Sequence, residues 1–206
     1  MIISVANLKG GLMRSTSAVL LAEAYSRMGK NVAIADTSWD GGVAHLLKLA
    51  RKNGNDSPID VREFPIGAIL QDHEIAEIGD DIRANIQNLE ESLGNDGIVI
   101  VDTNARQEQT LRELDSIVDR VAVPFDGSPV SVKQTRRTLL AVNAPTTLFI
   151  CRMIDDESIY QEMLNKVGVK PTHKSNAVIA YSEEYQRCHI PDDMPDYEAL
   201  SSELIR

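Results

Sequence analysis

The segment Asn7–Thr16, which reads NLKGGLMRST, lies between a short apolar run, Ile2–Ala6, and a helical pattern, Ser15–Met28. Gly10 and Gly11 allow the backbone to approach a ligand closely and to adopt positive φ. Backbone N–H groups in front of a helix N-terminus form a site for an anion. The place of this segment in the chain therefore predicts a phosphate-binding loop.

The letters of this segment depart from the usual phosphate-loop pattern GxxxxGK[ST]. Met13 stands where the second glycine belongs and Arg14 where the lysine belongs, while Ser15 keeps the position of the hydroxyl that binds Mg²⁺. A guanidinium retains the positive charge, but it is larger and planar, so its phosphate geometry must differ from that of lysine. The alternative interpretation is a Gly-Gly turn before a helix that Ser15 caps.

Runs rich in Val and Ile alternate with helical patterns along the chain. Runs that are apolar on both faces fit buried parallel strands, and their alternation with helices predicts βαβ units. We therefore expect one α/β domain over residues 1–206, P-loop NTPase-like, with a mostly parallel twisted sheet and helices on both faces. The expected strands are Ile2–Ala6, Val32–Ala35, Ile98–Val101, Val121–Val123, Thr147–Cys151 and Ala177–Ala180. The expected helices are Ser15–Met28, Gly41–Arg51, Asp72–Leu93, Glu108–Val118, Val130–Leu140, Glu157–Val167 and Tyr197–Ile205, with a polar loop at Lys52–Ser57.

Composition narrows the classes of function. A net charge of −10 over 206 residues favours solubility and disfavours a broad DNA- or membrane-binding face. Cys151 and Cys188 lie far apart without a zinc-binding spacing, and Cys151 sits in an apolar run typical of a core residue. The N-terminus has no signal-peptide pattern and no apolar stretch approaches the length of a membrane span, so we expect a cytoplasmic protein.

Two aspartates end predicted strands. Asp36 follows Val32–Ala35, and Asp102 follows the four aliphatic residues Ile98–Val101. The carboxyl ends of strands in an open α/β sheet face the ligand crevice, where such a carboxylate holds Mg²⁺ directly or through water. A turn residue at a strand end is the alternative for each aspartate. Together with the phosphate loop, the two positions favour nucleotide binding.

These motifs resemble those of the ParA/MinD group of deviant Walker A ATPases, most closely the small ParA-type plasmid partition ATPases. The family motif KGGxGK[ST]T corresponds to Lys9–Thr16, and the motif DxDPQ corresponds to Asp36–Asp40. The hydrophobic strand that ends in aspartate corresponds to Ile98–Asp102, and a family-like turn runs from Val123-Pro124 to Ser128-Pro129. The resemblance covers most of the chain, from residue 1 to about residue 155.

The resemblance implies binding of ATP or ADP with Mg²⁺ and dimerisation on ATP. It implies that Lys9 reaches across the homodimer to the partner's phosphates, that Lys9 and Asp36 take part in catalysis, and that Mg²⁺ is held by Ser15 and a water-bridged Asp102. Adenine contacts are expected in the loops after the later strands, from Arg152 and near Ser182–Tyr185; a surface arginine is the alternative for Arg152. The nucleotide contacts from the loop itself would be Lys9, Gly10, Gly11, Leu12, Met13, Arg14, Ser15 and Thr16.

Ser38 replaces the second aspartate of the DxDPQ motif, which in the family is tied to positioning the attacking water. Asp40 is a candidate substitute. We therefore expect a weak ATPase that hydrolyses ATP slowly to ADP and phosphate, which suits a switch with long-lived states. The alternative is a degenerate nucleotide-binding regulatory or interaction protein without significant ATPase activity, which Met13, Arg14 and Ser38 all favour.

A switch of this kind implies an adaptor protein, ParB-like or other, and a role in DNA or plasmid partition or intracellular positioning. Lys133, Arg136 and Arg137 share one face of a predicted helix and are the candidates for non-specific DNA contacts. A second basic cluster consists of Lys166, Lys170 and Lys174, and solvated helix faces are the alternative for both clusters. A MinD-like membrane switch needs a basic amphipathic C-terminal helix. The tail Asp196–Arg206 is acidic, so we expect no membrane binding.

Overall fold

The computed structural model describes residues 1–38, 41–52, 54, 57–66, 72–103, 108–152, 157–180 and 190–206. Within these ranges, seven strands form one wholly parallel sheet in the order β3-β2-β4-β1-β5-β6-β7. This arrangement confirms the expected α/β class. The strands are β1 (Ile2–Val5), β2 (Val32–Asp36), β3 (Asp60–Glu63), β4 (Ile98–Asp102), β5 (Arg120–Phe125), β6 (Thr146–Arg152) and β7 (His173–Ala180).

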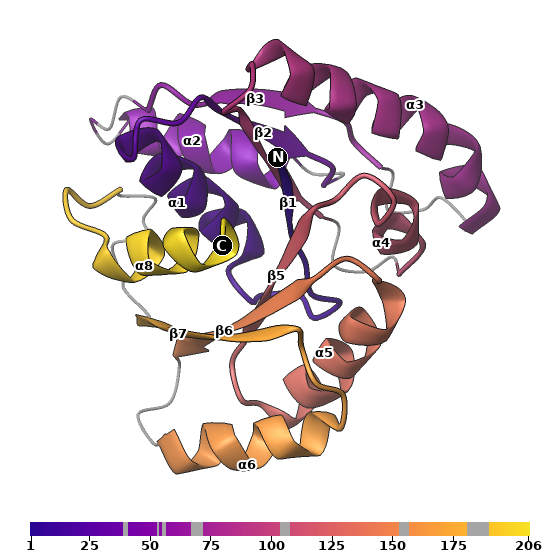
Figure 1. The fold of residues 1–206 in the computed structure, drawn as a ribbon, viewed down its shortest axis with the longest axis vertical. Helices are drawn as coiled ribbons and strands as arrows, with labels where there is room; N and C mark the ends of the chain where they lie inside the picture. Colours follow the sequence, from indigo (N-terminus) through magenta and orange to yellow (C-terminus); the bar gives the residue numbers. More distant parts are fainter. Residues whose placement is uncertain are drawn as a thin grey trace.

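Helices cover both faces of the sheet, as predicted (Figure 1). The face that carries the first helix is covered by α1 (Arg14–Arg27), α2 (Gly42–Lys52) and α8 (Pro195–Leu204). The opposite face is covered by α3 (Asp72–Ser92), α4 (Glu108–Leu114), α5 (Pro129–Ala141) and α6 (Glu157–Val167).

The central strands divide the core into two layers. Because successive side chains of a strand point to opposite faces, Ile3 and Val5 pack on the α1 side, whereas Ile2 packs on the α3 side. The four residues Ile98–Val101 alternate in the same way. Strands that are buried on both faces need apolar residues at every position, which explains the continuous aliphatic runs.

Two strands at the edges of the sheet differ from the sequence prediction. β3 was not predicted because its residues Asp60–Glu63 are charged and largely exposed, as is typical of an edge strand. β7 begins at His173, four residues before the predicted start at Ala177, because its exposed polar side chains alternate with buried ones. Both edges therefore lack the continuous apolar pattern that identified the central strands.

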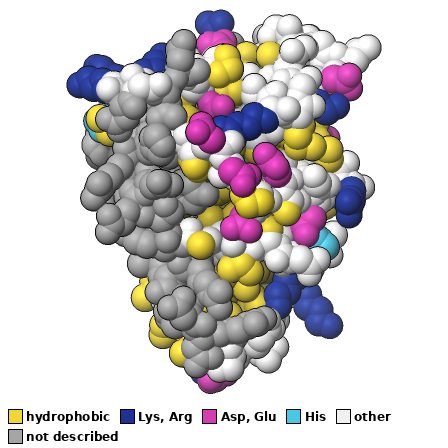
Figure 2. Space-filling model, turned by 90° about the vertical axis from the view of Figure 1, so that its left-hand side faces the viewer, with side chains coloured by type: hydrophobic (Ala, Val, Ile, Leu, Met, Phe, Trp, Pro, Cys, Tyr) yellow, Lys and Arg dark blue, Asp and Glu magenta, His cyan; other side chains and the backbone are white. Residues whose placement is uncertain are grey.

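The apolar face of α8 is part of the core. Tyr197, Leu200 and Leu204 are fully buried, and the Tyr25 hydroxyl of α1 donates a 3.0 Å hydrogen bond to the Ser201 carbonyl. Burial raises the pKa of Tyr25 well above its usual range. Figure 2 shows this side of the molecule, where acidic side chains gather among apolar ones near the middle of the view. No helix in the described ranges is long and apolar enough to cross a membrane.

Candidate phosphate and metal site

The loop between β1 and α1 keeps a glycine-like backbone where the sequence departs from the glycine pattern. Met13 has φ 54° and ψ 28°, and it is the one non-glycine residue with positive φ in the described part of the chain. Gly11 has φ +76°. A Cβ atom on Gly10 or Gly11 would meet no heavy atom within 4 Å. The space above the loop is therefore open to a ligand, which fits the predicted phosphate site.

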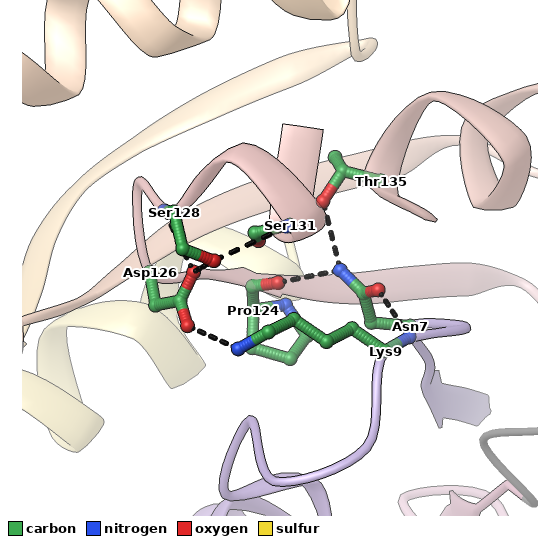
Figure 3. Close-up of polar contacts among 7 residues, drawn as sticks. All are labelled: Asn7, Lys9, Pro124, Asp126, Ser128, Ser131 and Thr135. Atoms are coloured by element: carbon green, nitrogen blue, oxygen red, sulfur yellow. Dashed lines mark hydrogen bonds and ion pairs between the residues drawn. The ribbon is translucent and has the colours of Figure 1, made fainter. Parts of the chain in front are cut away.

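Asn7 anchors the start of this loop to α5 (Figure 3). Its side chain is 1% exposed, and its amide nitrogen donates to the Pro124 carbonyl at 2.8 Å and to Thr135 Oγ1 at 2.9 Å. Asn7 Oδ1 accepts the backbone N–H of Lys9 at 2.9 Å, and the N–H of Leu8 donates to Thr138 Oγ1 at 3.0 Å. These contacts connect the loop to the buried face of α5. The sequence named Asn7 as the first residue of the predicted phosphate segment and did not identify its partners.

The side chains of Ser15 and Asp102 are hydrogen-bonded beside the loop. The Ser15 hydroxyl, in the first turn of α1, donates to Asp102 Oδ2 at 2.5 Å, and Asp102 at the end of β4 is fully buried. The register of β1 against β4 pairs Val5 with Asp102, so the parallel sheet places this carboxylate beside the loop. Mg²⁺ is commonly held by one or two carboxylates together with phosphate oxygens and water. The pair therefore suits the predicted metal site.

Arg14 begins α1 and lies across the end of β4. Its guanidinium donates to the Thr103 carbonyl oxygen, and the Thr103 hydroxyl donates to the Val5 carbonyl at 2.9 Å. The positive charge expected at the lysine position is therefore kept next to the loop. In this arrangement the planar guanidinium of Arg14 donates to a backbone carbonyl oxygen.

Asp36 caps α2. Its Oδ1 accepts the backbone N–H of Ser38 at 2.9 Å, and its Oδ2 accepts the backbone N–H of Val43 at 2.9 Å. The side chain is fully buried. Ser38 Oγ in turn accepts the N–H of Gly42 at 2.9 Å, so both residues satisfy N–H groups at the start of the helix. The catalytic role expected for Asp36 stays a prediction, but the geometry gives this carboxylate a structural task.

The N-terminus of α2 closely approaches the Ser15–Asp102 pair. A Cβ atom added to Gly42 would lie 3.0 Å from Ser15 Oγ and 3.5 Å from Ser38 Oγ. Any side chain at position 42 would therefore crowd the serine hydroxyl. Ser38, which replaces the family's second aspartate, lies next to the candidate metal site without bringing a charge.

Lys9 forms an ion pair with Asp126 just beyond β5 (Figure 3). The side chains are 19% and 4% exposed, respectively. Asp126 Oδ1 also accepts the backbone N–H of Ser128 at 3.0 Å and its hydroxyl at 2.8 Å. Burial raises the pKa of Asp126, but the hydrogen bonds from Lys9 and Ser128 outweigh this effect, so the pKa lies below its ordinary value.

Asp126 was missed in the sequence. It is the third aspartate to follow a strand, as Asp36 and Asp102 do, and the same strand-end rule applies to it. The predicted strand, Val121–Val123, ended too early because Pro124 interrupted the aliphatic run. In the structure, β5 continues through Pro124 to Phe125.

The remaining predicted residues lie away from this cluster or outside the described residues. The Arg152 side chain, Asp40 and Ser182–Tyr185 lie outside the described residues. Lys133, Arg136 and Arg137 are exposed on α5, and Arg137 pairs with Glu108 at 2.9 Å. Cys151 is 3% exposed, and burial raises the pKa of its thiol to about 12, which confirms a core residue.

One comparison with known proteins shows the family of this chain, and another shows its fold. The sequence matches the family model of ATPase MipZ over residues 1–179. No curated protein matches the sequence. Among solved structures, a putative plasmid partition protein of Borrelia burgdorferi B31 bound to AMPPNP shares 17% identity with a TM-score of 0.65, covering 99% of this chain and 97% of that chain. Apo McdA of Cyanthece shares 17% identity with a TM-score of 0.67, covering 100% of this chain and 99% of that chain. The ParA of pNOB8 bound to nonspecific DNA shares 12% identity with a TM-score of 0.64, covering 100% and 97%.

Proposed function

Because the chain belongs to the MipZ family of ParA-like ATPases, we propose that it is an ATP-binding switch that dimerises on ATP and acts in DNA partition or intracellular positioning. The observation that carries the proposal is the 2.5 Å contact between Ser15 Oγ and Asp102 Oδ2 beside the open Gly10-Gly11 loop. A hydroxyl and a carboxylate in contact support a Mg²⁺ site at these two side chains, and the loop amides beside them suit phosphate oxygens.

Each residue of the loop has a proposed task. The backbone N–H groups of the segment Lys9–Thr16 would surround the phosphates, and Arg14 would turn from the Thr103 carbonyl to neutralise phosphate charge. Ser15 and Asp102 would hold Mg²⁺. Bound ATP supplies the γ-phosphoryl group that water attacks, and Lys9 of each protomer would contact the phosphates held by the other.

We expect hydrolysis to be slow because Asp36, the carboxylate of the segment in which Ser38 replaces an aspartate, already accepts hydrogen bonds from the backbone. Asp36 uses one oxygen to accept the N–H of Val43 at the start of α2 and the other to accept the N–H of Ser38, and Ser38 carries no charge. General-base assistance requires a group within hydrogen-bond reach of the water that it activates. The same observation favours a second candidate function, a nucleotide-dependent regulatory protein that binds ATP without significant turnover.

The exposed face of α5 is the proposed DNA contact. The helix sequence PVSVKQTRRTLLA contains no acidic residue, and Lys133, Arg136 and Arg137 are exposed on it. Its buried face is hydrogen-bonded to the loop through Asn7–Thr135 and Leu8–Thr138, so a change in the loop can reach the surface. An adaptor protein, ParB-like or other, would then sense the nucleotide state.

Sedimentation with the non-hydrolysable analogue AMPPNP and Mg²⁺ tests the switch. The wild-type protein is expected to shift from monomer to dimer and Lys9→Ala to bind the analogue but remain monomeric. The control Lys30→Ala changes a partly exposed lysine just beyond the C-terminal end of α1 and is expected to behave as the wild type. Absence of analogue binding would refute the proposal. Binding without any dimer would favour the regulatory alternative.

Fluorescence anisotropy with a random-sequence DNA duplex tests the α5 surface. The double variant Lys133→Ala/Arg136→Ala is expected to weaken DNA binding and to reduce the slope of log affinity against log salt by about 1 per removed charge. The control is Lys166→Ala/Lys170→Ala, which removes two charges from the region of α6. Equal effects of the two double variants would show that overall charge, and not α5, determines binding.

A further inference from the structure

We propose that Asp126 is a positioning residue that holds Lys9 within its own protomer and thereby limits how readily two protomers associate. The inference rests on the proposed function, because it assigns regulation to the lysine that would cross the dimer. The juxtaposition that carries it is the ion pair between Lys9 Nζ, on the phosphate loop, and Asp126 Oδ2, beyond β5 (Figure 3).

The pair is largely shielded from solvent. Asp126 is 4% exposed and Lys9 is 19% exposed, so water screens this contact much less than it screens the surface ion pairs of the chain. For comparison, Lys30 and Asp96 are 32% and 83% exposed and lie 3.7 Å apart. A lysine that extends to a second chain must first leave a nearly buried carboxylate. The intramolecular contact therefore competes with the intermolecular one.

Asp126 is held in its turn by hydrogen bonds and by the close packing of Gly127 against Tyr160. Gly127 has φ +74°, and a Cβ atom there would lie 2.9 Å from the ring of Tyr160. Asp126 Oδ1 accepts two hydrogen bonds from Ser128, and the Ser128 hydroxyl accepts the backbone N–H of Ser131 in the first turn of α5. The carboxylate is thus locked to the start of α5.

Lys9, in contrast, carries its charge on a long side chain with four rotatable bonds. Its backbone N–H is held by Asn7 Oδ1 at 2.9 Å. The space over the adjacent Gly10 and Gly11 is open. Release of Lys9 therefore requires rotation of one side chain, with the loop and the turn left in place.

The effect on association is amplified because a dimer contains two such lysines. If the contact is open in about one protomer in three, both protomers are open in about one encounter in nine, and the apparent dimerisation constant is weaker by about that factor. Removing the contact would therefore tighten nucleotide-dependent dimerisation by about ninefold. A contact that is closed for a larger share of the time would give a larger factor.

The test replaces Asp126 with its neutral isostere, Asp126→Asn. The remaining amide oxygen can still accept from Ser128, while the amide nitrogen turned toward Lys9 is a donor and cannot hold an ammonium group. Two controls accompany it. Asp96→Asn makes the same charge change at the Lys30 pair. Ser128→Ala removes the cap of α5 and the hydroxyl bond to Asp126, but keeps the backbone bond to Asp126 and the Lys9 contact.

The first measurement is the dimer dissociation constant with AMPPNP and Mg²⁺ by sedimentation. Asp126→Asn is expected to dimerise about ninefold more tightly than the wild type, and both controls are expected to match the wild type. The second measurement needs no nucleotide: reductive methylation followed by mass spectrometry gives the labelling rate of the Lys9 amine. That rate is expected to rise severalfold in Asp126→Asn and to stay unchanged in the controls.

The outcomes separate this inference from the proposed function. If the wild type and Asp126→Asn both remain monomeric with AMPPNP, the dimerising switch is refuted. If the wild type dimerises and Asp126→Asn dimerises equally or more weakly, the inference alone is overturned, and Asp126 has a supporting role in the dimer. A Ser128→Ala protein that also dimerises more tightly would attribute the effect to the α5 cap and would equally overturn it. An unchanged Lys9 labelling rate in Asp126→Asn would contradict the contact itself.

Discussion

Met13 adopts a left-handed backbone conformation that an L-residue occupies only at a cost. Its φ of 54° and ψ of 28° lie in the αL region, directly before the first residue of α1. The clash between Cβ and the following carbonyl costs roughly 1–2 kcal/mol in this region, whereas glycine has no such penalty. We therefore expect Met13→Gly to relieve strain that Met13→Ala retains.

The expected magnitude follows from two opposing effects. Glycine loses more conformational freedom on folding than alanine, which costs roughly 0.5–1 kcal/mol. Subtracting this cost from the strain leaves Met13→Gly more stable than Met13→Ala by about 0.5–1 kcal/mol. At an ordinary helical position the order is reversed. Ala84→Gly, at an exposed site in the middle of α3, is expected to destabilise the protein by about 1 kcal/mol.

Urea unfolding followed by circular dichroism, supported by thermal melts, measures both comparisons. For a chain of this length the predicted difference at position 13 corresponds to about 1–4 °C in Tm. Both substitutions remove the same side chain beyond Cβ, so the comparison cancels nearly all lost packing. If Met13→Ala proves as stable as Met13→Gly or more so, the backbone of this loop is not strained and the reasoning fails.

Three further substitutions probe the aspartates of the site. Asp36→Ala is expected to reduce the free energy of unfolding by about 1–3 kcal/mol, because the N–H of Val43 in the first turn of α2 and the N–H of Ser38 lose their acceptor; an unchanged urea midpoint would contradict its capping role. Asp102→Asn is expected to abolish most of the gain in nucleotide affinity that Mg²⁺ provides, as measured by calorimetry with and without the metal. For Asp126, burial opposes ionisation but the hydrogen bonds from Lys9 and Ser128 prevail, so its folded pKa lies below the unfolded value of about 3.9. Its stabilising contribution is therefore complete above about pH 4 and is lost as the pH falls through the lower folded pKa, so Asp126→Asn should unfold with a flatter acid dependence than the wild type in urea titrations below pH 4.

The strand-end rule explains both the success and the failure of site prediction. Asp36 and Asp102 were found because each follows an uninterrupted aliphatic run. Asp126 obeys the same rule, but Pro124 concealed the end of its strand. Proline is tolerated in β5 although the strand lies inside the sheet, and the Pro124 carbonyl accepts the hydrogen bond that anchors Asn7. A local rule that penalises proline in strands could not foresee this use of it.

The sequence by itself determined the α/β class and the succession of the central strands and helices along the chain, and it predicted a phosphate loop between the first strand and the first helix. These features follow from hydrophobic periodicity and from glycine placement, which act over neighbouring residues. Strand β3 and the start of β7 were not predicted because edge strands have a solvated face and therefore carry polar side chains. Position 13 looked like a departure from the glycine pattern, yet its backbone keeps the conformation that glycine would adopt.

Only the tertiary structure showed which partners the charged residues of the site contact. Asp36 caps α2, and Asp102 lies against Ser15, 87 positions away in the chain. Lys9 is paired with Asp126 of its own protomer. The catalytic role of Asp36 and the reach of Lys9 to a second protomer stay predictions. Hydrogen bonds and ion pairs depend on distances below about 4 Å and on direction. Sheet register and helix placement set those distances between residues that are remote in sequence, and the pattern of letters does not contain them.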